Sequence, residues 1–445
     1  MFRRNKSDWL LCTLMVLAAG SGWSQQSPQS LPNGAFMPAP MQTASATPAG
    51  AGLSSTLKQA FDAAWLRQPE ALSQQARQEA GAARRSAADS WTAEPASVEL
   101  ATKTDRLNQN LGSREVFVGL TMPLWLPGER ARTGAVADAE NRVATSRVQA
   151  AQLRTAAVVR EAYWHWQRAR AGHELARERL NSSQQIAADV ARRVKAGDLA
   201  RSDQHQTDGA VASAEVELAD AAGTLAGAVQ RLLAQADLGL VQNDFQTPFS
   251  AAVMEAIPEV PTDLTDLDTR HPAVAELLDR AEVARRSAEL VRVQTRANPE
   301  LALATTRERG QFDEAYKQAI TLGIRIPFGS DSRNRARLAT AHADAIEVEG
   351  QLRLERERLL REVMAARVGL ESIRIQQSAS DRRAQLARES RSFFQKSFRM
   401  GETDLPTLLR IEREAIDAER QAARVRIDLA AAISSLRQTL GLLPE

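Results

Sequence analysis

Apolar residues recur every seven positions along four long segments of the chain. The two longest segments, residues 128–193 and 333–398, contain no proline. A sustained period of seven predicts coiled-coil helices, and a helix of about 65 residues would be on the order of 100 Å long. The predicted seam positions are Val136, Val143, Ala150, Ala157 and Trp164; Val211, Leu218, Leu225 and Leu232; Leu338, Ala345, Leu352, Leu359, Ala366 and Ile373; and Leu409, Ile416, Ala423 and Ala430.

Two other segments, residues 115–124 and 319–328, alternate apolar and small or polar residues instead. This period of two predicts strands, and about 10 residues is the length of a tilted membrane strand. Weaker partner strands are expected near residues 98–102 and 301–305. The predicted lipid-facing side chains are Val116, Val118, Leu120, Met122, Leu124, Ile320, Leu322, Ile324, Ile326 and Phe328.

The second half of the chain repeats the first at an offset of about 204 residues. Gly119 and Gly323, Pro123 and Pro327, and Gly197 and Gly401 all have this spacing. Each half is expected to run helix, strand, strand, very long helix, tight turn, long helix. A unit of about 200 residues is too long for a solenoid repeat, so we expect two structural halves.

Composition divides the chain into five parts. Residues 1–24 have the basic start, apolar run and small residues of a secretory signal peptide, and residues 25–55 form a flexible tether rich in proline and serine. We expect the first repeat over 56–240, a connector over 241–270 and the second repeat over 271–445. Without residues 1–24 the chain keeps 54 residues of each charge, so no net positive field favours nucleic-acid binding.

The four strands allow two interpretations, a soluble sheet and a membrane-inserted one, and the predicted export of the chain helps to decide between them. A soluble four-stranded sheet packed on helices is the general alternative, but each hairpin here leads directly into a helix too long to fold back over it. We therefore favour insertion into a membrane. Four strands leave open edges that lipid does not tolerate, and small membrane barrels need about eight strands. The chain is expected to oligomerise in order to close a barrel.

These features resemble the TolC-type outer-membrane efflux proteins over residues 57–443. The resemblance implies a mainly α-helical fold with a membrane β-barrel: three protomers give four strands each to a 12-stranded barrel that continues into a periplasmic α-helical tunnel. Within the family, the chain is most similar to the CzcC-like components of heavy-metal efflux systems. The residues that carry this likeness are Arg270-His271-Pro272-Ala273, Ala297-Asn298-Pro299-Glu300-Leu301 and Ile326-Pro327-Phe328 followed by Arg333-Asn334-Arg335.

The two tight turns match the family's periplasmic hairpin tips. Glycine supplies a left-handed helix cap at each turn, and Ser202 and Asp404 are expected to cap the helices that follow. The glycines could serve only as caps, or they could also shape a groove that docks the periplasmic adaptor. By resemblance the docking residues are Arg193, Gly197, Asp198, Arg399, Gly401 and Glu402, and the acidic candidates at the tunnel entrance are Asp203 and Asp404.

The motifs of catalysis are missing, and the five histidines are scattered along the helices, where solvated positions are expected. We predict no enzyme activity, cofactor or metal site. The resemblance implies a passive duct in the outer membrane of a Gram-negative bacterium, which extends into the periplasm. Its partners would be two further copies, an adaptor, an inner-membrane RND pump and lipid, and its cargo divalent heavy-metal cations. The alternatives are a duct for drugs or type I protein secretion, and a soluble periplasmic scaffold or adaptor.

Overall fold

The computed structural model describes residues 57–108, 110–236, 255–259, 270–329 and 331–445. All of them belong to one compact unit, which spans residues 53–445. The predicted signal peptide and tether lie outside the described residues, as does most of the predicted connector. None of the described helices combines the length and the apolar character that a membrane-crossing helix needs.

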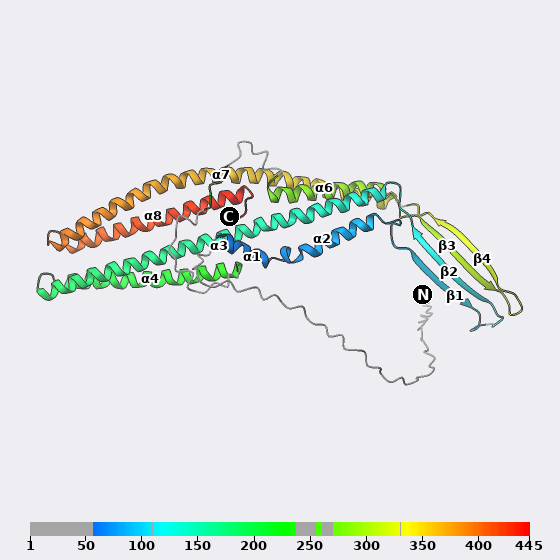
Figure 1. Cartoon of the computed structure of the whole chain (residues 1–445), viewed down its shortest axis with the longest axis horizontal. Helices are drawn as coiled ribbons and strands as arrows, with labels where there is room; N and C mark the ends of the chain where they lie inside the picture. Colours follow the sequence, from blue (N-terminus) through cyan, green and yellow to red (C-terminus); the bar gives the residue numbers. More distant parts are fainter. Residues whose placement is uncertain (1–56, 109, 237–254, 260–269, 330) are drawn as a thin grey trace, which may run out of the picture. The chain divides into compact units, whose positions relative to one another are not determined.

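The elements follow the predicted order in each half (Figure 1). In the first half they are α1 (Leu57–Leu66), α2 (Pro69–Ala88), β1 (Ser97–Thr104), β2 (Arg114–Pro123), α3 (Glu129–Ala196) and α4 (Arg201–Gln235). In the second half they are α6 (Pro272–Val293), β3 (Glu300–Arg309), β4 (Lys317–Arg325), α7 (Asp331–Arg399) and α8 (Leu405–Thr439). The 68 residues of α3 make a helix on the order of 100 Å long, as predicted.

The four strands form one antiparallel sheet in the order β1-β2-β3-β4. Both outer strands, β1 and β4, therefore have a backbone edge without a partner strand in this chain. The register places the apolar side chains of all four strands on one face, because residues directly opposite each other share a face. One row across the sheet is Val98, Leu120, Leu303 and Leu322, and the next is Leu100, Val118, Thr305 and Ile320.

The opposite face of the sheet carries small and polar side chains. Its central rows contain glycine, alanine, serine and threonine, with Phe117 and Glu99 among them. The apolar face is the more exposed one, with Ile320 at 76% and Leu322 at 72%. A sheet whose apolar face is bare has the polarity of a membrane strand set rather than that of a soluble sheet.

The helices attached to the strands pack in the same order as the strands themselves. α2 packs on α3, α3 on α6, and α6 on α7. Farther from the sheet, α4 and α8 return along α3 and α7, and α8 also packs against α3. The sheet and the helix layer therefore share their two outer sides. β1 and α2 form one of these sides, and β4 and α7 form the other.

Apolar clusters hold the described helices together, and the smallest consists of alanines of α7 and α8. The largest joins α1, α3, α4 and α8 around Tyr163, Trp166, Leu232 and Ile427. The second joins α6, α7 and α8, and a third lies where the two hairpin turns meet. The predicted seam positions are all buried or half-buried, so the heptad prediction is confirmed.

Two predicted boundaries are wrong. β2 ends at Pro123 and β4 at Arg325, so Leu124, Ile326 and Phe328 lie just beyond the strands. Proline has no backbone N–H and cannot continue a ladder, which accounts for the early end at Pro123 and before Pro327. The expected cap Ser202 lies inside α4, which begins after Ala200, because Asp203 supplies the capping contact instead.

Candidate docking tips and open edges

Both hairpin tips have the predicted glycine caps. Gly197 has φ of 85° and Gly401 has φ of 81°, in the left-handed region that glycine adopts without steric cost. At each tip the next residue donates its backbone N–H back into the helix: Asp198 to Arg193 O at 3.0 Å and Glu402 to Ser397 O at 3.0 Å. No heavy atom lies within 4 Å of a Cβ built on either glycine.

The first tip is fastened to the second by Arg193. Its guanidinium donates to the backbone oxygens of Phe398 at 2.9 Å and Arg399 at 3.2 Å. It also lies over the Phe398 ring, 4.7 Å from the centroid. Arg193 is therefore engaged with the second tip, whereas Asp198, Arg399 and Glu402 have exposed side chains.

An apolar cluster between the tips reinforces this contact. Val190, Phe398, Leu405 and Leu408 are buried together. Sequence reasoning located each tip but not their mutual contact, because the residues belong to separate heptad patterns about 204 positions apart.

The two acidic candidates differ in their surroundings. The Asp203 carboxylate accepts the Ala200 backbone N–H at 3.1 Å and is half-buried at the start of α4. Asp404 occupies the N-cap position of α8, as predicted, but its side chain makes no capping bond and is exposed. Both carboxylates lie beside helix N-termini, where the helix dipole stabilises negative charge.

The junction between strands and helices is held by one buried carboxylate. Glu129, at the start of α3, is 2% exposed. It accepts hydrogen bonds from Leu126 N at 2.9 Å, Asn298 Nδ2 at 2.8 Å and Gln294 Nε2 at 2.8 Å. Asn298 and Gln294 come from the second repeat, so the two hairpins are locked to each other where they enter the helices.

One long side of α7 exposes large apolar side chains, with charged residues such as Glu357 and Arg382 among them. Its exposed members recur at helical spacing and at 100° per residue fall within about a third of the circumference. We call this surface the α7 stripe; it consists of Ile346, Leu354, Leu360, Met364, Val368, Ile375, Leu386 and Phe393. The heptad positions Leu352 and Leu359 point the other way, into the core with α6 and α8.

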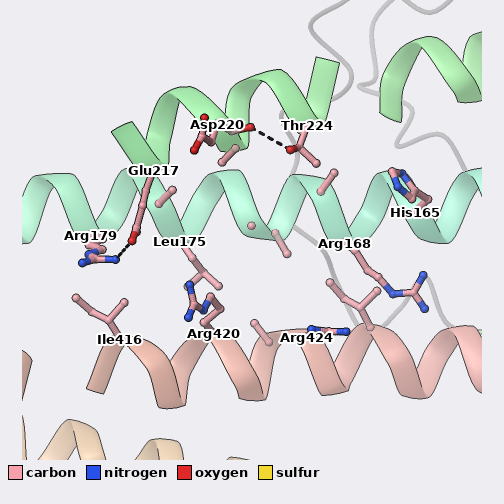
Figure 2. A pocket seen from close by; sticks show the side chains of 17 residues that line it. His165, Arg168, Leu175, Arg179, Glu217, Asp220, Thr224, Ile416, Arg420 and Arg424 are labelled. Carbon is pink, nitrogen blue, oxygen red and sulfur yellow. Dashed lines mark hydrogen bonds and ion pairs between the residues drawn. The ribbon is translucent and has the colours of Figure 1, made fainter. Parts of the chain in front are cut away.

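A groove of about 510 Å³ lies between α3, α4 and α8 (Figure 2). Arginines from α3 and α8 surround a floor of alanine and glycine. Each of these arginines has an acidic partner: Arg168 and Arg424 pair with Asp428, Arg179 with Glu217, and Arg420 with Asp417. The charges are balanced within the chain, so the groove presents no free cationic site.

A buried ion network joins the two repeats near the C-terminus. Glu255, in the connector, pairs with Arg160 at 3.0 Å and with Arg437 at 3.3 Å. Arg160 also donates to Ser434 Oγ at 3.0 Å, and burial lowers its pKa while the Glu255 charge raises it. Sequence reasoning missed Glu255, because the connector has no apolar period that could place it.

His271 is buried, contrary to the expected solvated position. It is 4% exposed at the N-terminus of α6, against Gly441, and neither ring nitrogen has a hydrogen-bond partner. Burial lowers its pKa; Glu355 opposes this shift and Arg358 adds to it. His271 is buried because it packs against residues near the C-terminus. The periodicity of its own helix does not reveal this contact.

Solved structures with this fold are outer-membrane channels. The described chain superimposes on CusC with a TM-score of 0.72 at 18% identity, over 88% of this chain and 93% of that one. MtrE of Neisseria gonorrhoeae gives 0.70 at 16% identity, over 87% and 89%. VceC of Vibrio cholerae gives 0.66 at 17% identity, over 87% and 97%. At these identities the likeness establishes the fold.

The family model of outer membrane efflux proteins matches residues 60–236. No curated protein matches the chain. The chain therefore has the fold of these solved structures, in which its four strands and long helices find their counterparts. The chain is thus similar to the outer membrane efflux proteins over its first repeat, and it shares the fold of the solved structures over both repeats.

Proposed function

We propose that three copies of this chain form one passive exit duct of a tripartite RND-type efflux system. The observation that carries this proposal is that the sheet and the helix layer have their free sides at the same ends, β1 with α2 and β4 with α7. If copies joined side to side, β4 of one copy would pair with β1 of the next. The same contact would cover α7. Three copies of four strands give 12, enough to close a barrel.

The α7 stripe supports the same assembly. Leu354 is 65% exposed, whereas Ala150, its counterpart in α3, is 1% exposed. Val368 is 69% exposed, whereas its counterpart Trp164 is 3% exposed. A large apolar stripe left bare marks an interface. The neighbouring copy is the partner that the order of the elements supplies.

The experiment replaces two stripe residues with charge, Met364→Glu and Val368→Glu together. Gln376→Glu is the control, because Gln376 is exposed on α7 about a quarter turn from the stripe. We expect the double variant to lose the heat-sensitive trimer band from the outer-membrane fraction and the control to keep it. A double variant that assembles like the wild type would contradict the interface, and a water-soluble monomeric wild type would favour the scaffold alternative.

We further propose that the tips dock the periplasmic adaptor. The exposed charges of Asp198, Arg399 and Glu402 support this role, together with the open space around both glycines. Gly197→Val with Gly401→Val would force a β-branched residue into a left-handed conformation, at a cost of roughly 1–2 kcal/mol per site. Resistance should be lost while the trimer still inserts. Intact resistance would rule out the docking role.

The proposed cargo is a divalent heavy-metal cation, delivered by the inner-membrane pump. The CzcC-like segments at residues 270–273, 297–301 and 326–335 and the acidic candidates Asp203 and Asp404 support this choice over drugs or secreted protein. Deleting the gene should sensitise cells to such cations and leave tolerance to organic drugs unchanged. Sensitivity to drugs alone would transfer the assignment to the drug-efflux alternative.

A further inference from the structure

Arginines occupy the apolar face of the sheet just beyond its apolar rows. Arg114 lies directly opposite Arg309, and Arg307 lies directly opposite Val116. Alternation along each strand places these arginines on the same face as Val116, Val118 and the exposed leucines and isoleucines. They lie toward the hairpin loops, at the end of the sheet away from the helices (Figure 1).

Two aromatic rings hold the arginines at this level. Arg307 lies 4.7 Å from the Tyr316 ring centroid, and Arg309 lies 5.0 Å from it. Arg309 is also 5.4 Å from the Phe312 ring and donates from Nε to Gly112 O at 3.0 Å. These contacts orient the guanidinium groups without neutralising them.

No carboxylate pairs with Arg114, Arg307 or Arg309 among the ion pairs of the described residues. Two of the nearby loop carboxylates are engaged by backbone: Asp105 accepts from Leu111 N at 2.7 Å, and Glu314 accepts from Gly310 N at 3.0 Å. Asp313 is exposed in the same loop and forms no ion pair with these arginines. The three arginines therefore form no ion pair with a carboxylate among the described residues. Two like charges directly opposite each other on a sheet are unfavourable.

The opposite face at the same end of the sheet is balanced. There Lys103 lies opposite Glu115, Glu115 opposite Glu308, and Glu308 opposite Lys317. That row has two lysines at its outer positions and two glutamates between them, so its net charge is zero, whereas the strands of the apolar face carry three arginines and no acid at this end. The excess of positive charge is confined to the face that would meet lipid.

We propose that Arg114, Arg307 and Arg309 bind the phosphate groups of a phosphorylated lipid in the outer leaflet of the membrane. This inference rests on the proposed function, because it requires the apolar rows to lie in lipid and the loops to face outward. Guanidinium groups bind phosphate oxygens in a bidentate manner, and the adjacent apolar rows would contact the acyl chains. The row of Arg114, Arg309 and Tyr316 would then mark the level of the headgroups.

The test compares the full-length wild type with Arg114→Gln/Arg307→Gln/Arg309→Gln, each extracted from the outer membrane and placed in phosphatidylethanolamine nanodiscs. Lys103→Gln/Lys317→Gln is the matched control, because it removes positive charge at the same level from the opposite face. The probes are diphosphoryl lipid A, its dephosphorylated form and inorganic phosphate. Binding is measured by native mass spectrometry of the intact assembly.

We expect the triple variant to retain diphosphoryl lipid A about tenfold less than the wild type, since three exposed charge pairs each contribute a factor of a few. The lysine control should bind like the wild type, and the dephosphorylated lipid should bind weakly to all three. If the triple variant does not assemble, Arg114→Gln/Arg307→Gln keeps the Arg309 loop bond and replaces it.

Equal retention by the triple variant and the wild type would overturn the lipid site while the trimer still stands. Equal binding of the dephosphorylated lipid, or full displacement by inorganic phosphate, would also overturn it. A wild type that neither assembles nor enters the outer membrane would instead overturn the proposed function together with this inference.

Discussion

The two repeats share one pattern but not one environment. Val159 in α3 and Val363 in α7 are counterparts, and each is 1% exposed. Trp164 and Val368 are also counterparts, yet the first is buried and the second is 69% exposed. The long helix of the first repeat, α3, is covered by α1, α2 and α4 of its own repeat and by α6 and α8 of the second, whereas α7 has substantial packing only with α6 and α8. The difference indicates that the uncovered side of α7 is the side of the second repeat that is available to another molecule.

The strands show the same contrast. β2 has a partner strand on each side, whereas its counterpart β4 has only β3. The exposed apolar positions of β4, such as Ile324 at 64%, exceed those of β2, such as Val118 at 39%. An uncovered edge strand is a site for pairing with another chain. In both layers the second repeat supplies one free side, β4 with α7, and the first repeat supplies the other, β1 with α2.

The largest effect is expected where the repeats are joined. Glu255→Gln removes the carboxylate that pairs with Arg160 of the first repeat and Arg437 of the second. Arg160 would lose its buried counterion and Arg437 would keep only Glu445, which we expect to destabilise the chain by about 3–5 kcal/mol. Glu259→Gln, an exposed position in the same segment, is the control. Thermal unfolding followed by circular dichroism measures both, and similar midpoints would show that the network does not hold the repeats.

A smaller effect is expected at the tips. The counterpart of Arg193 is Ser397, so Arg193→Ser makes the first tip resemble the second. The variant loses both hydrogen bonds to the second tip and the stacking on Phe398, a cost of about 1–3 kcal/mol confined to the tips. Hydrogen exchange should accelerate around residues 190–200 and 398–408 and stay unchanged in the sheet. Unchanged exchange at the tips would mean that the apolar cluster alone joins them.

The smallest effect depends on pH. The counterpart of His271 is Gln68, so His271→Gln again makes one repeat resemble the other. Burial lowers the folded pKa of His271 below its ordinary value of 6.5, so the unfolded chain binds the proton more readily. The wild type should lose stability as pH falls below about 6.5, and His271→Gln should lose less. Melting curves at several pH values give the comparison. Parallel losses in both proteins would place the acid sensitivity elsewhere.

The elements followed from the sequence because each has a strong local signal. The period of seven located the four long helices, and the alternation at residues 115–124 and 319–328 located β2 and β4. The glycines at 197 and 401 located the tips, since only a left-handed residue closes such a turn cheaply. These signals depend on residues close together in the chain.

The missed features depend on distant partners. Ser202 has the chemistry of a cap, but the carboxylate of Asp203 takes the Ala200 N–H instead. The α7 stripe was not predicted from the sequence. The heptad period locates the apolar residues of a helix but does not show which of its faces the neighbouring helices cover. The contact of Arg193 with Phe398 and the burial of Glu255 join segments whose separation in sequence gives no hint of contact.

The most direct test of the proposed side-to-side assembly is the number of chains that it contains. Wild-type protein is extracted from the outer-membrane fraction in mild detergent, and its mass is determined by native mass spectrometry. The account predicts a heat-sensitive species of three chains, which leaves neither β4 nor α7 uncovered. A monomer or dimer that is stable in solution, with the apolar face of its sheet exposed, would contradict it.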